Sequence, residues 1–126
     1  MMRVYKEFGF EAAHRLPTAP EEHPNARIHG HSFHVRVTLE GEPDPETGLI
    51  LNFADFERAL GQVKDRLDHT YLNDIDGLEM PTLERIAKWI AARLEGELPG
   101  LVEVHLSRPS CGEGCIYTCA GSRRAG

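Results

Sequence analysis

The sequence predicts an α+β fold, in which two helices cover one face of an antiparallel sheet. Three observations support this prediction: alternating polar and apolar residues near both ends of the chain, apolar residues spaced by three and four in the middle, and turn-forming residues between these segments. At 126 residues the chain is expected to form one domain, residues 1–126, with a loose tail at about residues 120–126.

Two long strands are predicted in the first third of the chain. In residues 3–15 nearly every second side chain is apolar, and this face of the strand ends in His14. In residues 27–39 the apolar face carries His29 and His31. Alternate side chains of a strand point to the same face, and strands joined by a short loop usually pair. The three histidines are therefore expected to lie together.

Two amphipathic helices are predicted after a turn-rich loop at residues 41–48. Asn52 is the expected N-cap of the first helix, which ends near residues 68–69, and Pro81 and Thr82 open the second. The apolar residues of both helices recur at spacings of three and four. They are Phe53, Phe56, Leu60, Val63 and Leu67 in the first helix, and Leu83, Ile86, Ile90 and Leu94 in the second.

Two shorter strands are predicted at the end of the chain, at residues 101–108 and about 115–119, which gives the order β-β-α-α-β-β. The cysteines Cys111, Cys115 and Cys119 all lie in this part. Their odd number argues against a disulfide framework. We interpret them as small, buried or half-buried residues of a C-terminal hairpin, and a redox role or a second metal site is the alternative.

The composition excludes several classes of partner. The net charge of −6 and the pI of about 5.6 leave no basic stripe for nucleic acid. No run of about 18 or more apolar residues is present, so no membrane helix is expected. The chain begins with a strand pattern rather than an apolar signal region, which argues against secretion and favours a cytoplasmic protein.

The histidines on the apolar strand faces point to a metal site. Burying adjacent imidazoles costs free energy unless each ring nitrogen has a partner, and one divalent ion can bind all of them. Three histidines without a fourth protein ligand are typical of catalytic zinc, which keeps one position open for water or substrate. Alternatively, each histidine is an ordinary polar residue bonded to a carbonyl group. The pattern leaves open whether Zn²⁺, Fe²⁺ or Mn²⁺ is the ion.

Six short motifs carry a resemblance to a known family. They are FEAAHRLP at 10–17, IHGHSF at 28–33, DPETG at 44–48, LDH at 67–69, YLND at 71–74 and GCIY at 114–117. Together they resemble the 6-pyruvoyltetrahydropterin synthase family, and specifically its bacterial 6-carboxytetrahydropterin synthase branch. The resemblance covers the chain from about residue 3 to residue 117.

The resemblance implies a tunnelling fold (T-fold), and a homohexamer with active sites at subunit interfaces. It implies a zinc-dependent lyase that binds Zn²⁺ through His14, His29 and His31, the residues that the strand pattern also brings together. The implied substrate is 7,8-dihydroneopterin triphosphate. The implied product is 6-carboxy-5,6,7,8-tetrahydropterin, on the route to the tRNA base queuosine.

The resemblance also implies roles for four other residues. His69 matches a histidine that relays protons from a cysteine base, and Asp68 matches the carboxylate that orients this histidine. Without the resemblance, the pair could be a cation at a helix C-terminus beside a surface acid. Thr82 and Glu84 match the segment that lines the pterin pocket.

The chain departs from the family pattern at two catalytic positions. The cysteine base is replaced by Asn25, whose amide cannot accept a proton at neutral pH, and no cysteine occurs in the first 110 residues. A sister branch uses a glutamate one residue later, where this chain has Ala26. The glutamate that anchors the pterin is replaced by Pro109.

Three functions remain open on the sequence alone. The first is a zinc enzyme of this family with a rearranged base, for example Glu22, His23 or a zinc-bound hydroxide. The second is a family member with a changed pterin substrate, whose side chain it cleaves by a retro-aldol step. The third is a zinc- or pterin-binding protein without turnover.

Overall fold

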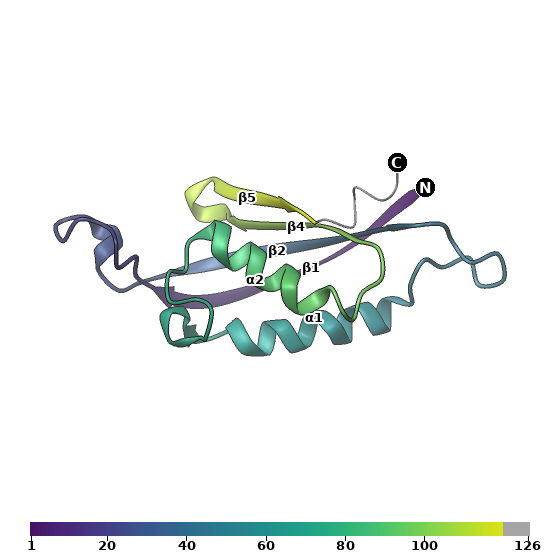
Figure 1. Cartoon of the computed structure of the whole chain (residues 1–126), viewed down its shortest axis with the longest axis horizontal. Coiled ribbons are helices and arrows are strands. Elements are labelled where there is room, and N and C mark those ends of the chain that lie inside the picture. The colour runs from purple at the N-terminus through teal and green to yellow at the C-terminus, as the bar shows by residue number, and fades with distance from the viewer. Residues whose placement is uncertain (120–126) are drawn as a thin grey trace.

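The computed structural model describes residues 1–119, and in this part of the chain five strands form one sheet with two helices packed on one of its faces (Figure 1). The strand order is β3-β1-β2-β4-β5. The strands are β1 (Met2–His14), β2 (His29–Gly41), β3 (Thr70–Tyr71), β4 (Leu101–Arg108) and β5 (Glu113–Thr118). The helices are α1 (Phe53–Leu67) and α2 (Leu83–Leu94), with 3-10 turns η1 (Pro24–Ala26), η2 (Leu72–Asp74) and η3 (Pro109–Cys111). This architecture confirms the α+β prediction; the loose tail predicted at about residues 120–126 lies outside the described residues.

The strands β1 and β2 form a long antiparallel pair whose apolar face is covered by the two helices. Phe10 and Phe33 are paired across the strands, are at most 2% exposed, and stack with ring centroids 4.7 Å apart. Burying an aromatic or aliphatic side chain of this kind stabilises the fold by about 1.5–3 kcal/mol. Because side chains alternate along each strand, the same core-facing register continues to the histidines at the strand ends.

Polar caps begin both helices at the predicted positions. The side chain of Asn52 accepts a hydrogen bond from the Ala54 backbone N–H, and Thr82 accepts one from Arg85. The apolar stripes are confirmed except at Phe53, the first residue of α1, which is 45% exposed. Its ring stacks on the buried Phe56 instead of entering the core.

Two features of the sheet differ from the prediction. The strand β3 pairs in parallel with β1, so the sheet is mixed rather than purely antiparallel. This strand was not predicted, because its two residues are too few to give an alternating pattern. The last strand spans Glu113–Thr118, whereas it was predicted at about residues 115–119. It begins earlier because Gly112, in the left-handed conformation (φ 66°), closes the η3 turn directly before it.

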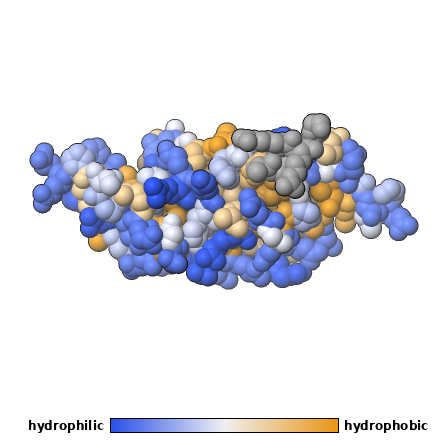
Figure 2. All heavy atoms as spheres, in the orientation of Figure 1, coloured by the Kyte–Doolittle hydropathy of each residue, from blue (hydrophilic) through white to orange (hydrophobic). Residues whose placement is uncertain are grey.

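The surface is mostly hydrophilic in the view of Figure 2, as expected of a charged chain. No helix in residues 1–119 has the length and apolarity needed to cross a membrane.

Candidate active site

His14, His29 and His31 lie together where the two long strands meet at one end of the sheet. His14 is the last residue of β1 and pairs with His29, the first residue of β2, while His31 lies two residues further on the same face. The ring centroids are 4.6, 5.1 and 4.8 Å apart. One nitrogen from each ring can be chosen so that all three lie within 4.8 Å of one another.

Backbone carbonyls fix the orientation of two of these rings. His14 Nδ1 donates to the Pro81 carbonyl at 2.9 Å, and His29 Nδ1 donates to the Arg27 carbonyl at 2.8 Å. Each ring is thereby held in the tautomer whose Nε2 carries the free lone pair. A carbonyl on the outer nitrogen is also the usual arrangement around a histidine that binds a metal.

His14 provides the test of whether a metal fits this cluster. Its side chain is 1% exposed, and its Nε2 has no hydrogen-bond partner within the described part of the chain. A buried polar atom without a partner costs about 1–3 kcal/mol. A metal ion between the three rings would satisfy this atom, and imidazole nitrogen suits Zn²⁺ as well as iron and other transition ions. The residues present therefore fit a metal site.

The protonation states also suit metal binding. Burial lowers the pKa of His14 from 6.5 to about 4, against a smaller raising effect of the hydrogen bond to Pro81. Burial, followed by the nearby Arg108 guanidinium, lowers the pKa of His31. Metal ligation requires neutral imidazole, so at pH 7 these rings need not lose a proton before they bind an ion.

The low pKa of His14 leads to a prediction about stability. With a chelator present, the free energy of unfolding should fall as the pH drops from about 6.5 to about 4, because in this window the unfolded chain binds a proton that the folded chain excludes. Over the whole window, the lowered pKa of His14 corresponds to a fall of about 3 kcal/mol in the free energy of unfolding. His14→Gln should remove this part of the pH dependence in urea unfolding. His34 lies on the opposite strand face, and His34→Gln is the control. An equal pH slope in all three proteins would contradict the prediction.

Asp68 and His69 form an ion pair at the end of α1, clamped to the backbone of β1. Asp68 Oδ2 lies 3.0 Å from His69 Nδ1, and Asp68 Oδ1 accepts from the Glu11 N–H at 2.8 Å. The His69 N–H donates to the Glu11 carbonyl at 2.6 Å. The Glu11 N–H, more than the His69 side chain, lowers the pKa of Asp68 and keeps it ionised. This carboxylate is therefore placed to stabilise a charged imidazole.

His69 itself is held in a strained and exposed position. Its φ of 58° is in the left-handed region, which costs a residue with a Cβ about 1–2 kcal/mol, and its side chain is 80% exposed. Strain of this kind is often found at functional sites.

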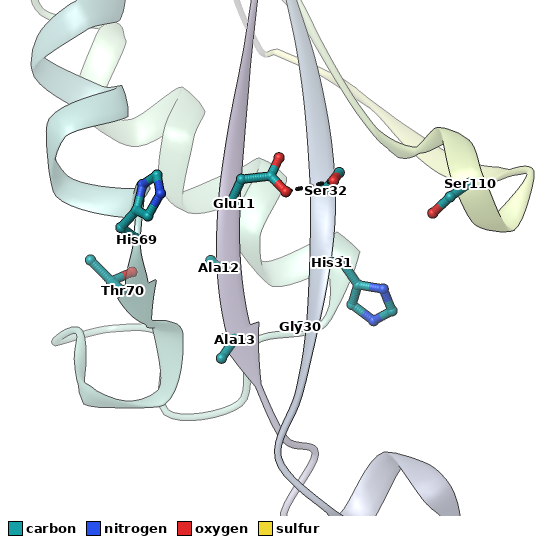
Figure 3. A pocket seen from close by; sticks show the side chains of 9 residues that line it. All are labelled: Glu11, Ala12, Ala13, Gly30, His31, Ser32, His69, Thr70 and Ser110. Carbon is teal, nitrogen blue, oxygen red and sulfur yellow. Dashed lines mark hydrogen bonds between the residues drawn. The ribbon is translucent and has the colours of Figure 1, made fainter.

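A cavity of about 600 Å³ lies over the ends of β1 and β2 (Figure 3). It is lined by Glu11, Ala12, Ala13, Gly30, His31, Ser32, His69, Thr70 and Ser110. Figure 3 shows His69 beside β1 and His31 beside β2, with both strands between them. Glu11 and Ser32, which share a 2.6 Å hydrogen bond, belong to the opposite strand face from His31. Within residues 1–119, no hydrogen bond or ring contact joins His69 to the three histidines.

The other two predicted site residues lie at the start of α2. Thr82 is its N-cap, and Glu84 is exposed in its first turn. The preceding residue, Pro81, holds His14 through its carbonyl. The start of α2 is therefore connected to the histidine cluster through one residue.

Asn25, where the cysteine base was expected, lies in η1 of the loop between β1 and β2. Its carbonyl accepts from the Leu16 N–H at 2.7 Å, and its own N–H donates to His23 Nδ1 at 3.1 Å. The backbone at this position is thus fixed by the loop and does not depend on the Asn25 side chain.

The three cysteines do not share a strand face. Cys111 lies in η3 and is exposed, with Sγ 4.0 Å from His31 Nδ1, so its interpretation as a buried residue is wrong. Cys115 is half-buried and donates to the Leu83 carbonyl at 3.4 Å, and Cys119 is buried. Burial raises the pKa of the Cys115 and Cys119 thiols, which is typical of structural cysteines.

Two residues near His31 were missed by the sequence analysis, Cys111 and Arg108. Arg108 Nη1 lies 3.5 Å from His31 Nε2. Cys111 lies within the η3 turn, where no periodic pattern applies. Arg108 ends the predicted strand at residues 101–108, but the alternation along that strand does not show that its end lies beside His31. Pro109 and Gly112 signal the turn but not its direction.

The mixed sheet, the two helices on one face and the three converging imidazoles define this chain as a T-fold protein with a candidate metal centre. Residues 3–120 match the family described as 6-pyruvoyl tetrahydropterin synthase. The chain belongs to this family.

Relatives with assigned names cover nearly the whole chain. It is 46% identical to the 6-carboxy-5,6,7,8-tetrahydropterin synthase of Synechocystis sp., over 98% of this chain and 92% of that protein. It is 36% identical to the dihydroneopterin monophosphate aldolase of Pyrococcus furiosus, over 89% of this chain and 90% of that protein. The solved structure of Caenorhabditis elegans 6-pyruvoyl tetrahydropterin synthase superposes with a TM-score of 0.82 at 23% identity, covering 94% of this chain and 96% of that one. At this identity the last comparison shows the fold alone.

Proposed function

We propose that this protein is a zinc-dependent lyase that converts 7,8-dihydroneopterin triphosphate into 6-carboxy-5,6,7,8-tetrahydropterin. The product is the one that the name of its Synechocystis relative gives for that protein. The observation that carries the proposal is the convergence of His14, His29 and His31, with the buried Nε2 of His14 left without a hydrogen-bond partner among residues 1–119. The product would enter queuosine biosynthesis in the cytoplasm.

The metal would supply Lewis acidity at one open position, where substrate oxygen atoms bind and neighbouring protons become more acidic. His14, His29 and His31 would hold it. The carbonyls of Pro81 and Arg27 keep the first two rings pointed inward, so little reorganisation is needed on binding.

His69 would move the protons in this reaction. Asp68 accepts the Nδ1–H of His69 and stabilises its charged form, which leaves Nε2 to take a proton from the substrate side and return it. Thr82 and Glu84 would line the pterin pocket at the start of α2, next to the segment that holds His14.

The separation of His69 from the three histidines supports a site shared between protomers. In one chain they lie on either side of the β1–β2 pair (Figure 3). A homohexamer would bring His69 of one protomer to the metal ligands of the next.

Complementation tests the shared site. His31→Ala and His69→Ala should each be inactive alone. When the two are refolded together, up to about a quarter of the sites should combine an intact His31 with an intact His69 and regain activity. Wild-type protein refolded in the same way is the control. If each chain forms its own complete site, the mixture stays inactive and the shared-site proposal is wrong.

The reaction is tested by incubating the zinc-loaded protein with 7,8-dihydroneopterin triphosphate and measuring free triphosphate. The proposed lyase takes up one water, releases triphosphate and the two outer side-chain carbons as a two-carbon aldehyde, and forms the 6-carboxy product. A protein that binds the pterin without any turnover would contradict the proposal.

A second candidate is an aldolase that acts on a phosphorylated dihydropterin. Two observations favour it: the absence of the cysteine base at Asn25, and the 36% identity to the Pyrococcus aldolase. A retro-aldol step breaks a carbon–carbon bond of the side chain, so the phosphate stays on the aldehyde fragment. Phosphorylated aldehyde in place of free triphosphate would identify this reaction.

A further inference from the structure

Arg108 is a charged side chain beside the histidine cluster to which the proposed reaction assigns no role. It is the last residue of β4, its side chain is 18% exposed, and its Nη1 lies 3.5 Å from His31 Nε2. On its other side, Nη2 forms an ion pair with Glu113 at the start of β5. A mostly buried cation is therefore held beside one of the three candidate metal ligands.

Not all hydrogen-bond donors of this guanidinium have an acceptor in the described part of the chain. Nη2 pairs with the Glu113 carboxylate, but Nε is buried and has no hydrogen-bond partner among residues 1–119. Nη1 can use His31 Nε2 as an acceptor only while that nitrogen keeps its lone pair. When the lone pair binds a metal ion, Nη1 loses this acceptor, and a poorly hydrated donor without an acceptor is costly.

A ligand oxygen at the open metal position would restore an acceptor for Nη1. A negatively charged oxygen fits best, because it attracts both the metal ion and the guanidinium, and hydrogen bonds between charged groups are the strong ones. Glu113 keeps the guanidinium in place and offsets part of its repulsion of the metal ion.

We infer that Arg108 binds an oxyanion of the ligand that occupies the open position beside His31. This inference rests on the proposed function only in its choice of ligand. The proposed substrate carries a triphosphate and the proposed product a carboxylate, and either oxyanion has the required chemistry.

The inference is tested on the protein loaded with Co²⁺, whose visible spectrum reports ligands at the metal. Inorganic triphosphate and acetate are titrated separately into wild type and Arg108→Met. We expect Arg108→Met to weaken binding of at least one anion about tenfold or more, the value of one lost charge-assisted hydrogen bond. If Arg108→Met loses more affinity for triphosphate, Arg108 binds the phosphate of the substrate. If it loses more affinity for acetate, Arg108 binds the carboxylate of the product. Cobalt affinity should be unchanged or tighter, since a positive charge is removed.

Two controls keep the inference falsifiable. Arg36→Met removes a guanidinium that also pairs with a glutamate, Glu7, but lies on the outer strand face, and it should leave anion binding unchanged. Arg108→Lys keeps the charge and should recover part of the affinity that Arg108→Met loses. Anion affinities within about twofold of wild type in Arg108→Met would overturn the inference. These titrations need no pterin, so a failure of the proposed reaction and a failure of this inference can be told apart.

Discussion

His31→Ala is expected to abolish stoichiometric zinc binding and, with it, the proposed lyase activity. Two imidazoles would remain, and two protein ligands are fewer than the three found in catalytic zinc sites. His31 is only partly buried, whereas His14 is 1% exposed, so truncating His31 perturbs the core less. Zinc content after dialysis, measured per chain, checks the prediction.

A matched control lies three residues further along the same strand. His34 points to the opposite face and lies 3.6 Å from Glu7, so His34→Ala should keep full zinc content. Thermal unfolding gives a second readout. Zinc at 100 times its dissociation constant should stabilise wild type and His34→Ala by about 2.7 kcal/mol and leave His31→Ala unchanged. Equal zinc content in His31→Ala and wild type would refute the ligand assignment.

The clustering of the three histidines could be predicted from the sequence because their placement depends on strand parity alone. His29 and His31 share a face two residues apart, and any antiparallel pairing that buries Phe10 beside Phe33 brings His14 to His29. The hydrophobic pattern fixes this register, since a slip of one residue would move every apolar side chain to the solvent.

The rest of the candidate site depends on turns and on contacts between distant segments. Arg108 reaches His31 across 77 residues of sequence, and its position follows from the pairing of β4 with β2. Asp68 is clamped by the Glu11 N–H, 57 residues away. The separation of His69 from the three histidines follows from its place after α1, where its N–H bonds to the Glu11 carbonyl of β1. Periodicity can assign a residue such as Arg108 to a strand face, but it does not show which distant segments meet.

The departure at Asn25 leads to the second large effect, which is a gain of activity. Asn25→Cys is expected to raise triphosphate release by on the order of a hundredfold or more, because a thiol can lose its proton near neutral pH and act as a general base, whereas an amide cannot. The η1 backbone should tolerate the change, since Asn25 is held through its own N–H and carbonyl. Initial rates with saturating zinc and 7,8-dihydroneopterin triphosphate give the measurement.

Two variants show whether the gain belongs to a thiol at this one position. Ala26→Cys places the same group one residue away, and Asn25→Ser places a hydroxyl that stays protonated, so neither should raise the rate. If Asn25→Cys also leaves the rate unchanged, the missing thiol is not what limits the reaction. The loss of the glutamate anchor at Pro109 would then matter at least as much, because a pterin that is not held at its far edge cannot keep its side chain within reach of any base. Phosphorylated aldehyde without triphosphate, formed at the same rate by wild type and Asn25→Cys, would instead assign the chain to aldol chemistry, for which the family's cysteine is not the limiting group.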